Sequence, residues 1–230
     1  MSHKSPTVLF VVGMLICTAA GGAEADESAT VTFEKIPLAV NPNEGCAVAD
    51  VDRDGRLDII AGPNWFAAPQ YAARPLREID EFDEDYLKNN GDHAYDVNGD
   101  GWVDVISGDW HGDQIFWYEN PGKVGLAKGL RWKPHVLKTT RGQNEAFFLR
   151  DLDGDGVPEI VVDCWKDEAP LVAWKLVSSD EGPSLTRHKL GKEGCGHGMA
   201  FGDVNGDGRE DILTAIGWYE QPAADPLSTA

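Results

Sequence analysis

The sequence predicts an all-β protein, a β-propeller of four-stranded blades with four repeats present. A nine-residue acidic loop recurs four times, and its first Asp stands at positions 50, 96, 151 and 203, at intervals of 46, 55 and 52 residues. That period is typical of one blade of about 40–50 residues with short insertions. Short β-branched runs follow every loop. No stretch beyond residue 25 has a convincing helical period, so strands account for the repeats.

The expected strands lie on both sides of each loop. Short apolar runs precede the loops, as in Cys46–Ala49 and Met199–Gly202, and β-branched runs follow at 59–60, 105–106, 160–162 and 212–213. Repeats two and three add a third strand, 114–118 and 171–174, and a last strand, 131–137 and 185–190. Residues 80–90 are polar and hold at most one helical turn. A Trp follows the last acid of every loop by six or seven residues: Trp65, Trp110, Trp165 and Trp218. Packing between blades is expected for this set, with a sugar-stacking surface as the alternative.

The N-terminal 25 residues predict a cleaved secretory signal. Lys4 gives a basic start, residues 7–20 form an apolar run, and the small residues of Ala23-Glu24-Ala25 follow. The run is short for a membrane span, although an uncleaved anchor is the alternative. Cleavage leaves residues 26–230 as one repeat domain, secreted, periplasmic or on the cell surface, with no membrane span.

The composition restricts the partners. The net charge of −19 excludes binding to nucleic acid through phosphates, which needs clusters of Lys and Arg, and suits divalent cations. The hydrophobic content of 42% excludes a disordered chain. Cleavage of the signal leaves Cys46, Cys164 and Cys195, an odd number. One disulfide with one free thiol, or buried unpaired thiols, are both compatible with it.

The four acidic loops predict calcium sites. Loop 1 is residues 50–58, loop 2 is 96–104, loop 3 is 151–159 and loop 4 is 203–211. Positions 1, 3, 5 and 9 of each loop supply side-chain oxygens, Gly at position 6 permits a sharp turn, and position 7 offers a backbone carbonyl. The predicted ligands are Asp50, Asp52, Asp54, Arg56, Asp58, Asp96, Asn98, Asp100, Trp102, Asp104, Asp151, Asp153, Asp155, Val157, Glu159, Asp203, Asn205, Asp207, Arg209 and Asp211.

Six to eight oxygen ligands in a flexible arrangement suit Ca²⁺ better than Mg²⁺, which requires strict octahedral geometry. Fourteen of the 39 acidic residues are predicted ligands in these four turns, where they repel one another without a cation. The loops lack the position-12 Glu of an EF-hand. Acidic turns without a metal are the alternative. Calcium is expected to stabilise the inner strand pair of each blade and to have no catalytic part.

The repeats resemble the FG-GAP/VCBS family of calcium-binding propeller blades, found in integrin α-subunit heads and many secreted bacterial proteins. The resemblance covers residues 31–220, and the segment Gly202–Gly208 is closest to the family pattern. It implies that each loop joins the first and second strands at the bottom of the disc, that ligands meet the opposite face, and that seven blades close the ring. This chain has four loops, and its fourth repeat is expected to lack a third and fourth strand. Either the propeller is incomplete, or residues 31–38 close a small ring as an outer strand.

A second recurrent position predicts a polar ring at the channel mouth. Six residues before each first Asp stand Glu44, Asn90, Glu145 and His197, with Asp92, His93 and Glu220 as further candidates. The ring holds a metal or a sugar, or it is polar because the channel is filled with water.

Two functions remain open from the sequence. The first is an exported module that binds a carbohydrate or an extracellular protein. The second is a fragment of a metal-dependent sugar lyase or dehydratase, because the Gly196-His197-Gly198 segment resembles the propeller of aldos-2-ulose dehydratase. Glu44, Glu145 and His197 are then the catalytic candidates. The chain has no nucleophile-elbow, zinc-protease, phosphate-loop or dinucleotide signature.

Overall fold

The computed structural model describes residues 31–82, 86–109, 111–140, 144–164, 170–194 and 198–228, without the side chains of residues 145, 146, 163 and 164. The predicted signal, residues 1–25, lies outside the described residues. The chain divides into two units, Met1–Ile36 and Pro37–Ala230, and every strand belongs to the second. Residues 31–36 are exposed and have no regular secondary structure. The described residues include no helix with the length and hydropathy to cross a membrane.

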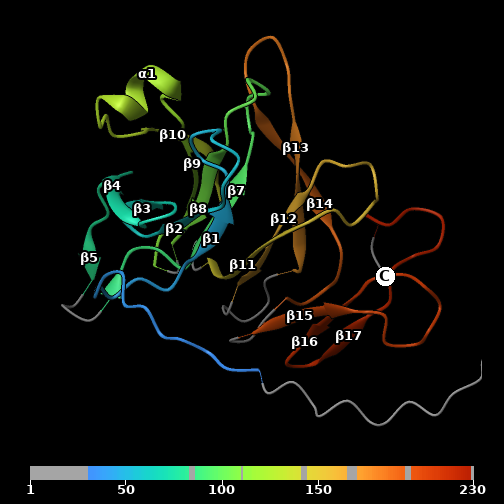
Figure 1. Cartoon of the computed structure of the whole chain (residues 1–230). Coiled ribbons are helices and arrows are strands. Elements are labelled where there is room, and N and C mark those ends of the chain that lie inside the picture. Colours follow the sequence, from blue (N-terminus) through green and yellow to red (C-terminus); the bar gives the residue numbers. More distant parts are fainter. Residues whose placement is uncertain are drawn as a thin grey trace, which may run out of the picture. The chain divides into compact units, whose positions relative to one another are not determined.

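Four antiparallel sheets form the second unit, and in each of them consecutive strands are neighbours (Figure 1). Sheet 1 contains β1 (Ala47–Ala49), β2 (Asp58–Ala61), β3 (Asn64–Ala67) and β4 (Ala72–Pro75). Sheet 2 contains β7 (Gly91–Tyr95), β8 (Asp104–Gly108), β9 (Gln114–Glu119) and β10 (Lys133–Thr139). Sheet 3 contains β11 (Asn144–Arg150), β12 (Glu159–Cys164), β13 (Val172–Val177) and β14 (Ser184–Lys189). Sheet 4 contains β15 (Met199–Gly202), β16 (Asp211–Thr214) and β17 (Gly217–Tyr219). The all-β, repeated architecture predicted from the sequence is confirmed.

Each acidic loop connects the first and second strands of its sheet. The residue before the loop pairs with the loop's last acid in all four sheets: Ala49 with Asp58, Tyr95 with Asp104, Arg150 with Glu159, and Gly202 with Asp211. The loop therefore closes a hairpin whose strands continue away from it in register. This connection agrees with the prediction from the repeat pattern.

Several local predictions are wrong. Sheet 4 has a third strand, because Gly217–Tyr219 pairs with β16. Residues 31–38 form no strand, so this segment does not supply an outer strand in this structure. Residues 80–90 contain no helical turn among their described positions, and a two-stranded hairpin of β5 (Glu81–Phe82) and β6 (Tyr86–Leu87) stands there. A six-residue helix, α1 (Gly122–Ala127), lies between β9 and β10.

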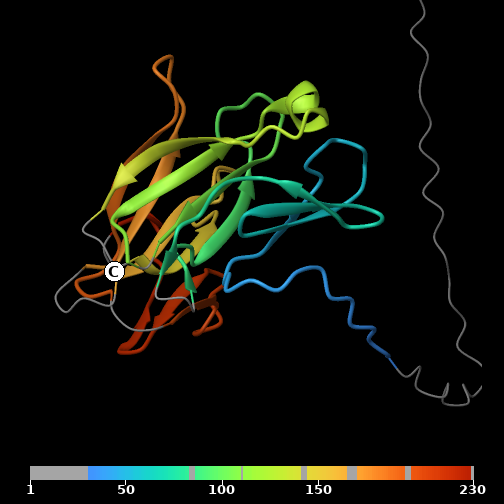
Figure 2. The same ribbon diagram turned by 90° about the vertical axis from the view of Figure 1, so that its left-hand side faces the viewer.

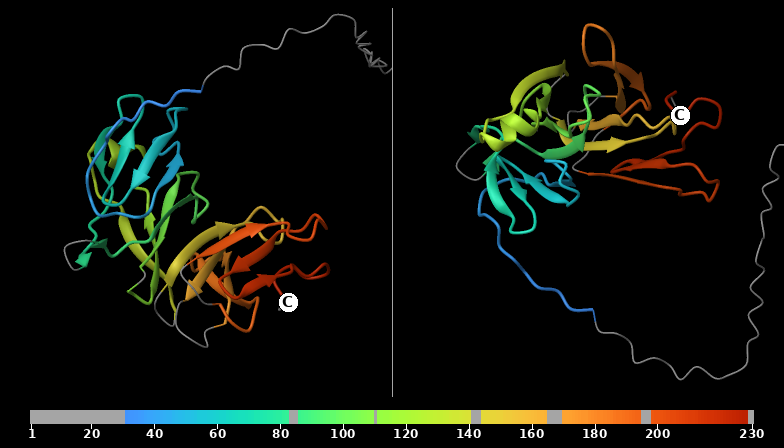
Figure 3. Two further views of the ribbon diagram at one scale, coloured as in Figure 1. Left: turned by 90° about the horizontal axis from the view of Figure 1, so that it is seen from below. Right: turned by 45° about the horizontal axis from the view of Figure 1, so that its top comes forward.

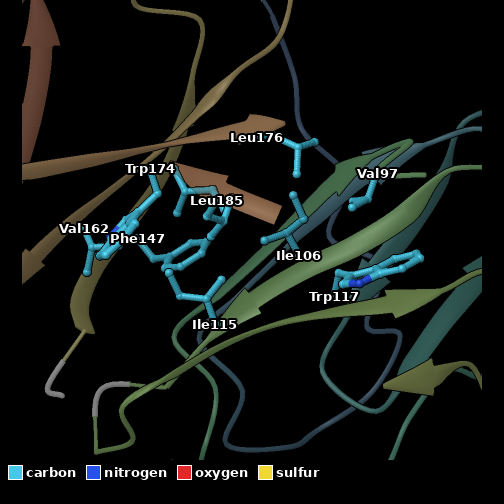
Figure 4. Packing of buried hydrophobic residues seen from close by; sticks show 10 residues of the cluster. Val97, Ile106, Ile115, Trp117, Phe147, Val162, Trp174, Leu176 and Leu185 are labelled. Carbon is cyan, nitrogen blue, oxygen red and sulfur yellow. The ribbon is translucent and has the colours of Figure 1, made fainter. Parts of the chain in front are cut away.

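The hydrophobic core consists of three layers, each between two consecutive sheets (Figures 2 and 3). The layer between sheets 2 and 3 is shown in Figure 4 and contains Val97, Ile106, Ile115, Trp117, Phe147, Ile160, Val162, Trp174, Leu176 and Leu185. The first strands also meet, since β7 contacts both β1 and β11. Sheets 2 and 3 each lie between two of these layers, so the apolar residues 105–106 of β8 and 160–162 of β12 are buried on both faces.

The recurrent Trp residues do not share one environment. Trp65 on β3 is buried in the layer between sheets 1 and 2, as expected for a packing residue. Trp218 on β17 is exposed, which contradicts that expectation for sheet 4. Trp110 and Trp165 lie outside the described residues. The same sequence position is therefore core in one repeat and surface in another.

Candidate metal centre

The first Asp of every loop organises the turn through backbone hydrogen bonds. In loop 2, Oδ1 of Asp96 accepts the N–H groups of Gly99 and Asp100 at 2.9 and 3.1 Å, and Oδ2 accepts that of Gly101 at 2.8 Å. The first Asp of each other loop makes the position-6 bond and at least one of the other two, at 2.7–3.0 Å. Three N–H groups on one carboxylate fix its oxygens toward the loop interior.

The turn requires a left-handed residue at position 6. Gly55, Gly101, Gly156 and Gly208 have φ of 86°, 84°, 87° and 84°. Only glycine adopts this conformation without steric cost. Position 4 is also left-handed, and in loop 1 it holds Arg53, with φ 61°. The Arg53 guanidinium lies 5.4 Å from the centre of the Trp102 ring in loop 2, so adjacent loops contact one another.

The ninth residue of each loop is a fully buried acid. Asp58, Asp104, Glu159 and Asp211 are at most 1% exposed. Each accepts the N–H of the loop's second residue at 2.9–3.1 Å. The three Asp residues accept a second N–H as well, and for Asp104 this comes from Asn120 at 2.8 Å. The buried acid thus joins its loop to the sheet and keeps lone pairs for a cation.

Carboxylate oxygens converge in the two loops that have acids at positions 1, 3, 5 and 9. Ligand atoms of Asp50, Asp52 and Asp54 lie within 4.8 Å of one another in loop 1. In loop 3 the same holds for Asp151, Asp153 and Glu159. Oδ1 of Asp52 is buried and accepts no hydrogen bond from the described residues. A buried carboxylate oxygen without a donor fits a hard cation such as Ca²⁺.

The electrostatics of loops 1 and 2 also favour a cation. Burial, followed by repulsion from Asp58 and Asp54, raises the pKa of Asp52. Burial raises the pKa of Asp104 to about 7, although hydrogen bonds from Asn120 and Val97 oppose the shift. Both carboxylates are therefore costly to ionise without a nearby positive charge.

Loop 3 already contains a positive charge. The Lys175 ammonium on β13 donates to Asp153 and, at 2.7 Å, to Oδ2 of Asp155, and lies 3.3 Å from Oε1 of Glu159. Burial disfavours the charged form of Lys175, but the hydrogen bonds to Asp153 and Asp155 raise its pKa above the ordinary value. Lys175 also lowers the pKa of Asp155.

The loops with Arg at position 7 are arranged differently. Nη1 of Arg56 contacts Oδ2 of Asp54 at 3.1 Å in loop 1. In loop 4, Nη2 of Arg209 contacts Oδ2 of Asp207 at 2.5 Å and Glu220 at 3.1 Å. Each guanidinium reaches only the position-5 acid of its own loop. Glu220, a sequence candidate for the channel mouth, therefore lies beside the acidic loop of sheet 4.

The predicted polar ring is only partly described. Glu44 is exposed, the side chain of Glu145 is not described, and His197 lies outside the described residues. Near these positions the first strands of sheets 2 and 3 are close, since Nδ2 of Asn90 donates to the Asn144 carbonyl and Nε2 of His93 lies 2.9 Å from the Phe147 carbonyl. A site that combines Glu44, Glu145 and His197 stays a prediction.

Sequence reasoning missed the buried ion pair of Arg77 and Asp92, which are 3% and 2% exposed. Asp92 was a candidate for the mouth, but its Oδ2 also accepts the Gly62 N–H at 3.0 Å and so links sheets 1 and 2. Arg77 stacks over the Tyr118 ring at 4.6 Å. An Arg directly after the apolar Leu76 was the only local signal for this pair.

Fold and loops together define a class, a repeat protein of antiparallel sheets whose first hairpins close through Asp-rich turns. Residues 96–162 match the family described as FG-GAP-like repeat. The match begins at the first Asp of loop 2 and includes all of loop 3, so the chain contains an FG-GAP-type repeat. A search among curated proteins gave no match to the chain.

Proposed function

We propose that the chain is an exported, calcium-binding part of a β-propeller that presents a binding surface for a carbohydrate or an extracellular protein. The observation that carries the proposal is the recurrence of one loop geometry in four sheets, with a buried acid at position 9 and with converging carboxylate oxygens in loops 1 and 3. The layered packing of consecutive sheets and the match to FG-GAP-like repeats support the propeller.

Calcium in this proposal has a structural part. It is held by side-chain oxygens at positions 1, 3, 5 and 9, and by the carbonyl at position 7. It offsets the repulsion among these acids and fixes the hairpin between the first two strands. Since binding to the folded state alone stabilises it, calcium couples to folding by mass action.

The opposite ends of the strands offer a place for the ligand. A cavity of about 280 Å³ lies where β8 ends and β9 begins, away from loop 2. Its lining includes Asp80, Ser107, Asp109, Asp113, Phe116 and Tyr118. Aromatic rings beside carboxylates suit the apolar face and the hydroxyl groups of a sugar, so this cavity favours the carbohydrate.

Calorimetric titration of EDTA-treated protein with Ca²⁺ tests the metal part of the proposal, and heats that never rise above those of buffer would reject it. A glycan array with the full chain tests the second part. Tyr118→Ala is not a suitable probe because Arg77 stacks on that ring, and Phe116→Ala is preferable. Glycan binding unchanged by Phe116→Ala would exclude this cavity.

A further inference from the structure

We infer that the cation of loop 3 is the Lys175 ammonium, so this loop is closed by a side chain where the other loops take calcium. The inference deepens the proposed function, since it assigns which acidic loops bind metal. The bound species is a divalent cation that is coordinated by oxygen atoms, and Lys175 is the residue that excludes it from loop 3.

The contacts of Lys175 place its charge among the predicted ligands. Its Nζ bonds the carboxylates at positions 3 and 5, Asp153 and Asp155, and lies 3.3 Å from Oε1 of the buried Glu159 at position 9. These are three of the four acidic positions of the loop. The Lys175 side chain is 20% exposed, so most of it packs against the sheet.

The strand register explains why only loop 3 has this arrangement. Lys175 on β13 is the direct cross-strand partner of Glu159 on β12. The residues at the same register position in sheets 1, 2 and 4, each one step beyond the last paired residues, are Ala67, Glu119 and Glu220. Ala67 gives loop 1 no counter-charge from the third strand, and the two Glu residues add negative charge beside loops 2 and 4.

Loops 1 and 3 form a natural comparison because both have acids at positions 1, 3, 5 and 9. Each loop has one buried carboxylate oxygen that accepts no hydrogen bond from the described residues, Oδ1 of Asp52 in loop 1 and Oε1 of Glu159 in loop 3. The difference is that the Lys175 ammonium lies 3.3 Å from the Glu159 oxygen, whereas in loop 1 Arg56 reaches only Asp54. In loop 3, the equivalent residue of Asp52 is Asp153, which accepts from Lys175. A Ca²⁺ ion entering loop 3 must displace the ammonium from two charge-assisted hydrogen bonds and one ion pair, whereas in loop 1 it competes only with the exposed Arg56 at Asp54.

The test is the calcium stoichiometry of the full chain by equilibrium dialysis after removal of metal with EDTA. Lys175→Met keeps the stem and removes the charge, and we expect it to bind one more Ca²⁺ per chain than the parent. Lys192→Met makes the same change at an exposed position of the same repeat and should leave the number unchanged. Ala67→Lys places an ammonium beside loop 1 and should remove one Ca²⁺.

Equal stoichiometry for the parent and Lys175→Met overturns the inference, while calcium binding by the parent leaves the proposed function intact. If the parent binds no calcium, the metal part of the proposed function is rejected. If Lys175→Met then binds one Ca²⁺ per chain, the inference about Lys175 is still supported. If neither protein binds calcium, both the proposed function and the inference are rejected. If Lys175→Met does not fold, Tb³⁺ soaked into crystals of the parent decides. Anomalous peaks at other acidic loops but not at loop 3 support the inference, and a peak among Asp151, Asp153 and Glu159, or no peak at any loop, overturns it.

Discussion

A substitution of Asp100, at position 5 of loop 2, can distinguish two roles of a loop carboxylate: forming the turn and binding a metal ion. Its Oδ1 accepts the Trp102 N–H at 2.8 Å, and the amide oxygen of an Asn accepts the same bond. The side chain is exposed, so its replacement opens no cavity. Asp100→Asn therefore keeps the backbone bond of the turn, loses the exposed bond from Nδ2 of Asn98 to Oδ2, and removes one negative charge. In EDTA we expect the free energy of unfolding to change by no more than about 0.5 kcal/mol.

Calcium should separate the variant from the parent. A ligand at about 100 times its Kd stabilises a folded protein by about 2.7 kcal/mol per site, and a site weakened about 100-fold keeps only about 0.4 kcal/mol. One kcal/mol corresponds to about 2–4 °C for a domain of this size. Asp100→Asn should therefore lose about 5–9 °C of the calcium-dependent rise in melting temperature. Because repeats unfold partly independently, the loss should be largest in the transition that includes sheet 2.

Two readouts check this expectation. Differential scanning calorimetry in EDTA and in Ca²⁺ gives the shift, with Asp113→Asn as a control that changes the same charge in the same sheet outside the loop. Trp102 is the one aromatic residue in the sequences of the four loops, so Tb³⁺ emission excited through tryptophan reports mainly on loop 2. A calcium-dependent shift equal to the parent's, or a loss just as large in EDTA, would refute the assignment of Asp100 as a metal ligand.

Three further predictions follow from buried charge and backbone geometry. Because the folded-state pKa of Asp104 is raised to about 7 from an ordinary 3.8, its stabilising contribution is complete below about pH 4 and lost as pH rises through 7. The metal-free protein should thus be about 2 kcal/mol less stable at pH 8 than at pH 5.5 by urea unfolding, and calcium should reverse the trend. Gly55→Ala meets no atom within 4 Å, but φ of 86° should make it cost about 1–2 kcal/mol, unlike Gly202→Ala, which has equal space and no positive φ. Arg77→Met leaves Asp92 buried and unpaired and should cost about 3–5 kcal/mol in the same assay, and a loss below about 1 kcal/mol would contradict the buried pair.

The acidic loops could be predicted from the sequence because the groups that interact in them lie close together in the chain. The loop hydrogen bonds join residues two to seven positions apart, so the nine-residue pattern alone specified the turn and its position between two strands. The strand β17 was missed because it has three residues, too few for a period to appear. Helix α1 was missed for the same reason, since six residues with two Gly carry no helical signal.

The charge balance of the loops could not be predicted in the same way. Lys175 is 16 residues from Glu159 in the sequence, and only the pairing of β12 with β13 places it opposite that acid. A slip of one residue in that register would turn its side chain to the other face of the sheet. The acidic pattern therefore identifies where carboxylates gather, and the register of the third strand determines whether a lysine lies among them.

The two ends of the sheets are stabilised differently: contacts within one loop dominate at one end, and contacts between sheets dominate at the other. This difference affects where a ligand is expected to bind. At the loop end, each hairpin is closed mainly by hydrogen bonds within its own nine residues. At the opposite end, Asp92 bonds Arg77 and Gly62 across sheets 1 and 2, and the His93 ring contacts the Phe147 carbonyl of sheet 3. The segment from Asp109 to Asp113 between β8 and β9 is bonded through its backbone, since the Gly112 carbonyl accepts from Nδ2 of Asn144 in sheet 3 at 3.4 Å and the Asp113 carbonyl accepts from Thr140. A change of the exposed Asp113 side chain can alter the cavity beside Phe116 and leave these backbone bonds in place, so ligand specificity should follow the side chains of this connection and stability should follow the acidic loops.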